Sequence, residues 1–236
     1  MRLWGLFLML GAAMPAMDVQ YYCWGFLNVH EERTGIPETQ AQEIHKGHMA
    51  HMGRMAAAGR LLAAGPLATP GGARGLLVYK CDNVAEAVEW TNLDPAVVNK
   101  RLRVEMYRWM TQGGWGEPLA IKLKADPNYK YAMVRLPFAI LMRTEKTADG
   151  RLPPEDVGKA HLAYSTKLVE EGKLRSFGPF EGAKDKLGVF VYAAMTVEDA
   201  RKLAEDDPLV KGGWGLPVMH VWFVADEAVP RRQRYP

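Results

Sequence analysis

Apolar and polar positions follow two different periods along the chain, and the order of these periods predicts the fold. Residues 21–30 are rich in aromatic and β-favouring side chains and predict a strand. Residues 38–58 place Ile44, His48 and Met52 on one stripe at helical spacing, so they predict a helix. Three further strands and one helix are expected, the strands at residues 61–64, 76–81 and 102–110 and the helix at residues 84–93. This βαββαβ order is the ferredoxin-like arrangement, an antiparallel sheet with both helices on one face.

The chain then repeats the same pattern. A shift of 113 residues places His48 on His161 and Trp109 on Trp222, with no gap between them. The same shift superimposes further pairs, namely Lys46 on Lys159, Gly59 on Gly172, Gly65-Pro66 on Gly178-Pro179, Gly75 on Gly188 and Asp94-Pro95 on Asp207-Pro208. The second copy predicts strands at residues 138–143, 174–180, 188–193 and 217–224 and helices at residues 154–171 and 197–205. We therefore expect one domain of about a hundred residues used twice, within the usual size range of small domains.

The expected organisation has three parts. Residues 1–19 lie outside the repeat, residues 20–124 form the first domain and residues 125–236 form the second. The link between the domains, residues 112–128, contains three glycines and two prolines and is expected to be irregular.

Residues 1–19 have the layout of a signal peptide. Arg2 precedes an apolar run, residues 3–11, and small residues follow it. The run is too short to span a bilayer, which takes roughly 20 apolar residues. We therefore expect a periplasmic or secreted protein whose mature chain does not insert into a membrane; the alternative is a cytoplasmic protein with a disordered or packed N-terminal segment.

Composition and charge restrict the function. The chain is 48% hydrophobic and 24% charged, which is typical of a globular protein. The net charge is +3, and the basic residues are scattered except for a terminal cluster in residues 231–234, so no nucleic-acid partner is expected. The two cysteines, Cys23 and Cys81, could form one disulfide if the first and third strands pair; the aligned positions of the second copy, 136 and 194, are not cysteines.

Two histidines and two aspartates are the candidate catalytic residues. His48 and His161 lie on the apolar face of the first helix of each copy, while Asp94 and Asp207 follow the second helix. In a ferredoxin-like fold the second helix returns beside the first half of the first helix, so each aspartate can reach a histidine. A carboxylate there would fix one imidazole tautomer. A buried histidine that only braces the core remains the alternative.

Other motifs are weaker candidates for a functional site. Gly65-Pro66 and Gly178-Pro179 end the second strand of each copy, where backbone geometry is the favoured explanation; they are also candidates for ligand binding through the backbone amides of the loop. His45 and His51, on either side of His48, do not share one helix face, and their counterparts in the second copy are Gly158 and Tyr164, so no metal site is expected. Nothing in the sequence calls for a cofactor.

Several segments together resemble the YCII-related (YciI-like) domain family. They are residues 47–52, 58–66, 74–75, 94–97 and 101–105 up to Trp109, and again residues 161–162, 172–174, 178–180 and 207–212. The resemblance covers nearly everything after the leader. It implies an α+β barrel in which two ferredoxin-like units pack sheet to sheet around a pocket, here as a pseudo-dimer within one chain. It also implies an active site with a histidine and an aspartate, matching His48 with Asp94 and His161 with Asp207.

The resemblance leaves two functions open. Related proteins include a dehydrochlorinase of a chlorinated hydroxyhydroquinone, and muconolactone isomerase shares the barrel, which suggests proton abstraction beside a carbonyl or phenol. The first hypothesis is thus an isomerase or lyase of small molecules. The second is a non-catalytic ligand-binding or structural protein of the cell envelope. Either would act as a monomer or a homodimer, and the two sites need not be equivalent, because Ala64 stands where the second copy has Phe177.

Overall fold

The computed structural model describes residues 18–68 and 73–231. The leader expected at residues 1–19 lies outside the described residues except for its last two positions. Among the described residues, no helix has both the length and the apolar character needed to cross a membrane.

The first copy folds in the predicted order. Its elements are β1 (Val19–Val29), α2 (Glu38–Ala57), β2 (Leu61–Pro66), β3 (Ala73–Tyr79), α3 (Val84–Asn92), α4 (Pro95–Val98) and β4 (Leu102–Gln112). A side-chain cap from Asn83 to the amide of Glu86 starts α3. Gly59, with a φ of 68°, allows the turn that ends α2.

The second copy repeats this order. Its elements are β5 (Met133–Met142), α6 (Glu155–Glu170), β6 (Leu174–Glu181), β7 (Lys186–Tyr192), α7 (Val197–Glu205), α8 (Pro208–Lys211) and β8 (Leu216–Ala225), followed by the 3-10 turn η1 (Asp226–Ala228). The predicted α+β class with two ferredoxin-like repeats is therefore confirmed.

The two copies join into one eight-stranded antiparallel sheet. Its strand order is β2-β3-β1-β4-β6-β7-β5-β8. Trp109 of β4 pairs with Phe180 of β6 at one seam, and Leu67, just after β2, bridges Trp222 of β8 at the other. The second contact closes the sheet into a barrel. Because a shift of 113 residues carries Leu67 onto Phe180 and Trp109 onto Trp222, the two seams are equivalent.

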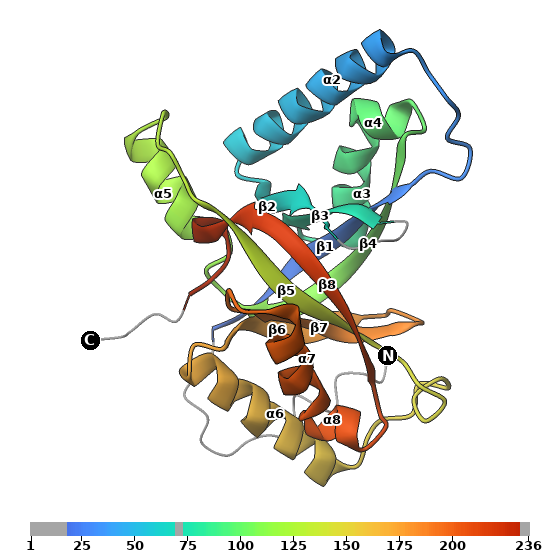
Figure 1. The fold of residues 1–236 in the computed structure, drawn as a ribbon, viewed down its shortest axis with the longest axis vertical. Coiled ribbons are helices and arrows are strands. Elements are labelled where there is room, and N and C mark those ends of the chain that lie inside the picture. Colours follow the sequence, from blue (N-terminus) through green and yellow to red (C-terminus); the bar gives the residue numbers. More distant parts are fainter. Residues whose placement is uncertain (1–17, 69–72, 232–236) are drawn as a thin grey trace.

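Helices cover the barrel on two opposite outer faces. In Figure 1, α2, α3 and α4 lie over the half of the sheet from the first copy, and α6, α7 and α8 lie over the other half. Separate apolar clusters hold these layers together: Leu61, Leu77 and Tyr79 belong to the first, and Phe177 and Phe190 to the second.

Aromatic side chains fill the space between the two halves of the sheet. All eight strands contribute buried residues to this interior cluster. Its largest members are four fully buried tryptophans, Trp24, Trp109, Trp115 and Trp222. The ring centroids of Trp24 and Trp109 lie 4.8 Å apart, and those of Trp109 and Trp115 lie 5.1 Å apart, both in the edge-to-face geometry that aromatic pairs favour. Aromatic packing thus makes up much of the barrel interior, and the pocket that the family resemblance implied there stays a prediction.

The structure differs from the sequence predictions at the link. The segment expected to be irregular contains a helix, α5 (Glu117–Ala125), which starts after Gly116 and places Pro118 in its first turn. Lys122 of α5 forms an ion pair with Glu227 of η1 at 3.1 Å. The link therefore attaches the first copy to the end of the second.

The two copies differ by one residue in their first strands. Tyr22 pairs with Trp109 in β1 and β4, whereas Leu136 pairs with Trp222 in β5 and β8. The first strands therefore correspond at a shift of 114 residues instead of 113. The second-copy counterpart of Cys23 is consequently Pro137, and the expected counterpart at position 136 was wrong.

A disulfide joins Cys23 to Cys81. Cys23 lies on β1 opposite Tyr79 of β3, and Cys81 follows β3 by two residues. The two Cα atoms are 6.0 Å apart, within the range that a disulfide requires. The bond ties β1 to the end of β3 in the first copy.

Candidate functional site

His48 lies in the middle of α2, beside the single turn α4. The residue before it, Gly47, allows the two helices to approach closely, because a Cβ there would lie 2.9 Å from Cγ of Pro95. The His48 side chain is 18% exposed, so its ring is accessible from solvent while most of it packs against the protein.

Asp94 is held in place by the start of α4. Pro95 disfavours helical geometry at Asp94, which is extended with φ −69° and ψ 127°. Its Oδ1 accepts a hydrogen bond from the Ala96 amide at 2.8 Å and so caps α4. Its Oδ2 lies 2.6 Å from Nδ1 of His48. The carboxyl side chain is fully buried. Asp94 therefore begins a new turn, in addition to following the helix that the sequence predicted to end there.

The second copy builds the same arrangement. Asp207 caps α8 by accepting a hydrogen bond from the Leu209 amide at 2.8 Å. Nδ1 of His161 lies 2.8 Å from Oδ2 and 3.0 Å from Oδ1 of Asp207. The His161 side chain is 16% exposed and that of Asp207 is 2% exposed. The structure thus brings together both histidine and aspartate pairs named from the sequence.

The geometry of each pair fixes the role of the imidazole. A carboxylate can only accept, so the hydrogen bond is donated by Nδ1–H, and in the neutral ring the lone pair then lies on Nε2. The structure gives Nε2 of His48 and His161 no hydrogen-bond partner among the described residues. Each ring therefore presents a basic nitrogen to whatever enters beside it.

A buried tyrosine accompanies each aspartate. Burial raises the pKa of Tyr79 to about 12; a hydrogen bond from Thr91 opposes this, and the charge of Asp94 adds to it. Burial, and next the charge of Asp207, likewise raise the pKa of Tyr192. Both phenols therefore stay protonated at neutral pH.

His51 distinguishes the first pair from the second. It lies one turn after His48, is 2% exposed, and its Nε2 has no hydrogen-bond partner among the described residues. Burial lowers its pKa, and the charge of Asp94 only partly offsets this. The aligned residue, Tyr164, instead donates to the carbonyl of Leu203 at 3.0 Å. The sequence analysis considered His51 only as part of a rejected metal triad, although its spacing from Ile44 and His48 places it on the same apolar stripe of the helix.

The two Gly-Pro steps lie at the barrel seams. A Cβ on Gly65 would lie 1.9 Å from the carbonyl oxygen of Phe223, and one on Gly178 would lie 1.9 Å from that of Met110. The carbonyl of Gly178 also accepts a hydrogen bond from Nε1 of Trp109 at 3.2 Å. These contacts give the glycines a packing role between the copies; ligand binding at Gly65, Pro66, Gly178 and Pro179 stays a prediction.

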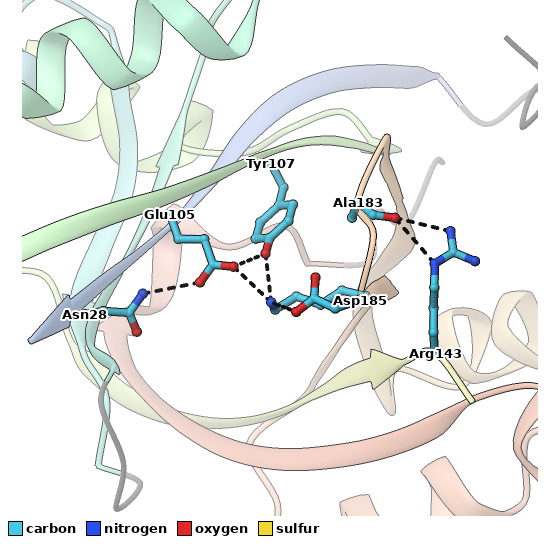
Figure 2. A network of polar contacts seen from close by, with 7 residues as sticks. Asn28, Glu105, Tyr107, Arg143, Ala183 and Asp185 are labelled. Atoms are coloured by element: carbon cyan, nitrogen blue, oxygen red, sulfur yellow. Dashed lines mark hydrogen bonds and ion pairs between the residues drawn. The ribbon is translucent and has the colours of Figure 1, made fainter. Parts of the chain in front are cut away.

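A separate polar network crosses one side of the barrel between the copies. Lys186 at the start of β7 donates to Glu105 at 3.0 Å, to Tyr107 at 2.7 Å and to Asp185 at 2.6 Å. Tyr107 also donates to Glu105, and Asn28 donates to Glu105 at 3.4 Å. Figure 2 shows the Glu105 and Tyr107 side chains of β4 converging with Asp185 of the other copy. No sequence pattern marks this cluster, because its members lie far apart in the chain.

The described part of the chain contains no group of three or more histidine, cysteine, aspartate or glutamate residues arranged to hold a metal ion.

Solved structures with the same fold cover most of the chain. A heme-binding protein from Thermus thermophilus aligns with 89% of this chain and 93% of its own, at 15% identity and a TM-score of 0.52. A mutant chlorite dismutase from Candidatus Nitrospira defluvii aligns with 90% of this chain and 93% of its own, at 10% identity and a TM-score of 0.57. At these identities the likeness shows a shared fold. No curated protein matches the chain by sequence.

The family assignment comes from the sequence. The profile of the YCII-related domain matches residues 20–109 and again residues 137–220, one match in each structural repeat. Each match contains both members of one histidine and aspartate pair, His48 with Asp94 in the first and His161 with Asp207 in the second. The chain therefore belongs to the YCII-related domain family and carries that domain twice.

Proposed function

We propose that this protein is an enzyme acting on small organic molecules through general acid and base chemistry. One observation carries the proposal: a buried carboxylate holds Nδ1 of a partly exposed histidine, at 2.6 Å in the first copy. A positioned acid or base of this kind typically contributes a rate factor of about 10² to 10⁴.

The proposed reaction begins with proton removal. Nε2 takes a proton from a C–H or O–H group next to a carbonyl or within a phenol, and the bonding electrons pass to the carbonyl or ring. Asp94 or Asp207 stabilises the imidazolium through Nδ1–H. The imidazolium then returns the proton to another atom, which completes an isomerisation, or the electrons expel an adjacent leaving group such as chloride, which completes an elimination.

The structural neighbours suggest heme as another ligand, because one is described as heme-binding. The residues around His161 do not fit a porphyrin. The Phe177 and Phe190 rings lie 6.2 and 5.8 Å from the imidazole, centroid to centroid, and belong to a buried cluster under α6. No step of the proposed chemistry uses heme.

The first test replaces both histidines. We expect His48→Gln with His161→Gln to abolish turnover in a screen of catechols, lactones and haloaromatic compounds, because the basic nitrogen is lost. The melting temperature should change little, since a glutamine amide can still donate to the buried carboxylate.

The non-catalytic alternative predicts a different result. Each aspartate also caps a helix, so each pair could serve only to hold α4 or α8 in place. In that case neither the unaltered protein nor the double variant would convert any compound in the screen.

We also propose that the protein functions in an oxidising compartment, the periplasm or the exterior of the cell. The disulfide between Cys23 and Cys81 supports this, because such bonds are rare in reducing compartments. The apolar leader read from residues 3–11 supports it independently.

A further inference from the structure

A titratable side chain is buried on the face of α2 that packs against α4. On this face, a Cβ on Gly47 would lie 2.9 Å from Cγ of Pro95. His51 lies four residues after Gly47, so it points from the same face, and it is 2% exposed. Its Nε2 is buried without a hydrogen-bond partner among the described residues. Buried polar atoms without a partner are uncommon in native proteins, so this one needs an explanation.

The groups that act on His51 come from three helices. Burial disfavours the charged ring and lowers the pKa of His51 from its ordinary 6.5. The charge of Asp94, before α4, opposes this, as does the backbone of Trp90 in α3, while Arg54 and His48 of α2 repel a charged ring. Both oxygens of Asp94 already accept hydrogen bonds. A charged His51 would therefore compete with His48 for this carboxylate.

The second copy has a neutral group in the same place. Tyr164 aligns with His51 and donates a hydrogen bond to the carbonyl of Leu203 at 3.0 Å. Burial raises the pKa of Tyr164 to about 12, and nearby acidic residues add to this. The phenol thus stays uncharged from acid to neutral pH, a range in which a histidine can change its charge.

Acid acts on the contact at His51 in one direction. The closed state, with α2 packed on α3 and α4, lowers the pKa of His51, so a state with α2 released binds more protons below pH 6.5. The stabilisation of the closed state is complete above pH 6.5 and is lost as the pH falls toward the lowered pKa. The charged ring regains water only when α2 separates from its neighbours. Because His48 lies on α2 and Asp94 caps α4, the same movement separates this pair.

We propose that His51 is a pH switch in the first copy: protonation of its ring loosens α2 from α3 and α4, and with it the contact between His48 and Asp94. The second copy keeps its contact in acid, because Tyr164 takes up no charge. The switch acts through the position of α2 and holds whether or not the histidine and aspartate pairs are catalytic.

Hydrogen exchange of the full chain, followed by mass spectrometry and corrected for the intrinsic rate, measures the opening of each helix. From about pH 7.5 to about pH 5.5 the protection of α2 should fall about tenfold, the effect of one extra proton bound by the open state. The protection of α6 should stay the same. Because α6 carries His161 of the equivalent pair, it controls for protonation of the pairs themselves.

NMR follows the contact between His48 and Asp94 directly. The Nδ1 proton of His48 should exchange with water faster in acid, and the Nδ1 proton of His161 should not.

Substitutions exchange the two copies at this position. His51→Gln removes the titratable nitrogen, and His51→Tyr introduces the residue of the second copy; both should make the protection of α2 independent of pH. Tyr164→His should give α6 the loss of protection in acid, and it tests the proposal even if neither variant at position 51 folds. His45→Gln is the matched control, because His45 is exposed on α2, and this variant should keep the response of the unaltered protein.

Three results would overturn the proposal. The first is an equal loss of protection at α2 and α6 in the unaltered protein, and the second is a loss at α2 that persists in His51→Gln. Where the variants at position 51 do not fold, the third is an α6 without an acid response in Tyr164→His. None of these measurements needs turnover, so failure of the enzymatic proposal would leave this test intact.

Discussion

At Gly65 and Gly178, the absence of a side chain determines whether the barrel can close. An added Cβ would lie 1.9 Å from a carbonyl oxygen of the neighbouring strand in both cases, so the strands would have to separate. We expect Gly65→Ala and Gly178→Ala each to lower the free energy of unfolding by about 1–3 kcal/mol, the usual cost of overpacking. Urea denaturation followed by tryptophan fluorescence measures this, because the tryptophans lie in the interior cluster.

Gly53 provides the control for this prediction. It lies in the interior of α2, and no atom lies within 4 Å of a Cβ built there. Gly53→Ala should therefore raise the free energy of unfolding by about 0.5–1 kcal/mol through helix propensity alone. Equal effects of the Gly53 and Gly65 substitutions would show that the seams tolerate a side chain.

Individual site residues could be predicted from sequence to the extent that the chain repeats them. His48 and Asp94 stand out because His161 and Asp207 follow at the same interval, and the topology brings each pair together. The cluster around Lys186 has no repeated counterpart. It depends on side-chain packing between distant segments, which periodicity does not encode.

Secondary-structure elements were predictable where the hydrophobic periodicity agreed with the residues that start and end an element. Residues 197–205 match α7 at both ends, because Thr196 caps the helix and Asp207-Pro208 follows it. β5 was predicted to start at Phe138 but starts at Met133, since Pro137 resembles a strand breaker. The structure tolerates Pro137 because pairing with β7 begins only at Phe138. The missed helix α5 lies in the link that was predicted to be irregular because of its glycines and prolines.

At the scale of elements, the disulfide of the first copy makes a contribution to stability that can be measured. It closes a chain segment with a sequence separation of 58 residues and ties β1 to the end of β3. We expect reduction to lower the free energy of unfolding by about 2–4 kcal/mol, the typical contribution of such a bond. Denaturation in urea with and without a reducing agent measures the difference.

A double variant separates the bond from other effects of the reducing agent. Cys23→Ala with Cys81→Ala removes both cysteines of the chain, so its stability should be the same with and without reductant. Oxidised protein that unfolds at the same urea concentration as reduced protein would contradict a stabilising role for the bond.

For the molecule as a whole, the two copies share one interior, and the polar network around Glu105 is one of the features that break their symmetry. The strands that cross the barrel match in register, yet Glu105 and Tyr107 correspond to Val218 and His220, and Lys186 corresponds to Ala73. The network therefore links the copies on one side of the barrel by charge, and the equivalent side lacks these groups.

This asymmetry makes stability depend on pH in a defined direction. Burial raises the pKa of the Glu105 carboxyl, but hydrogen bonds from Tyr107 and Lys186 outweigh it, so the net pKa is lowered from its ordinary 4.5. A carboxyl whose pKa is lower in the folded state stabilises the fold above its unfolded pKa, and this stabilisation is lost as the pH falls through the folded pKa.

Glu105→Gln should therefore unfold at a lower urea concentration than the unaltered protein at pH 6, and the difference should shrink below pH 4.5. Glu89→Gln, an exposed substitution on α3, should show no such pH-dependent difference. If the difference in unfolding urea concentration between Glu105→Gln and the unaltered protein stays constant from about pH 6 to about pH 3, the charge of Glu105 does not help to hold the two copies together.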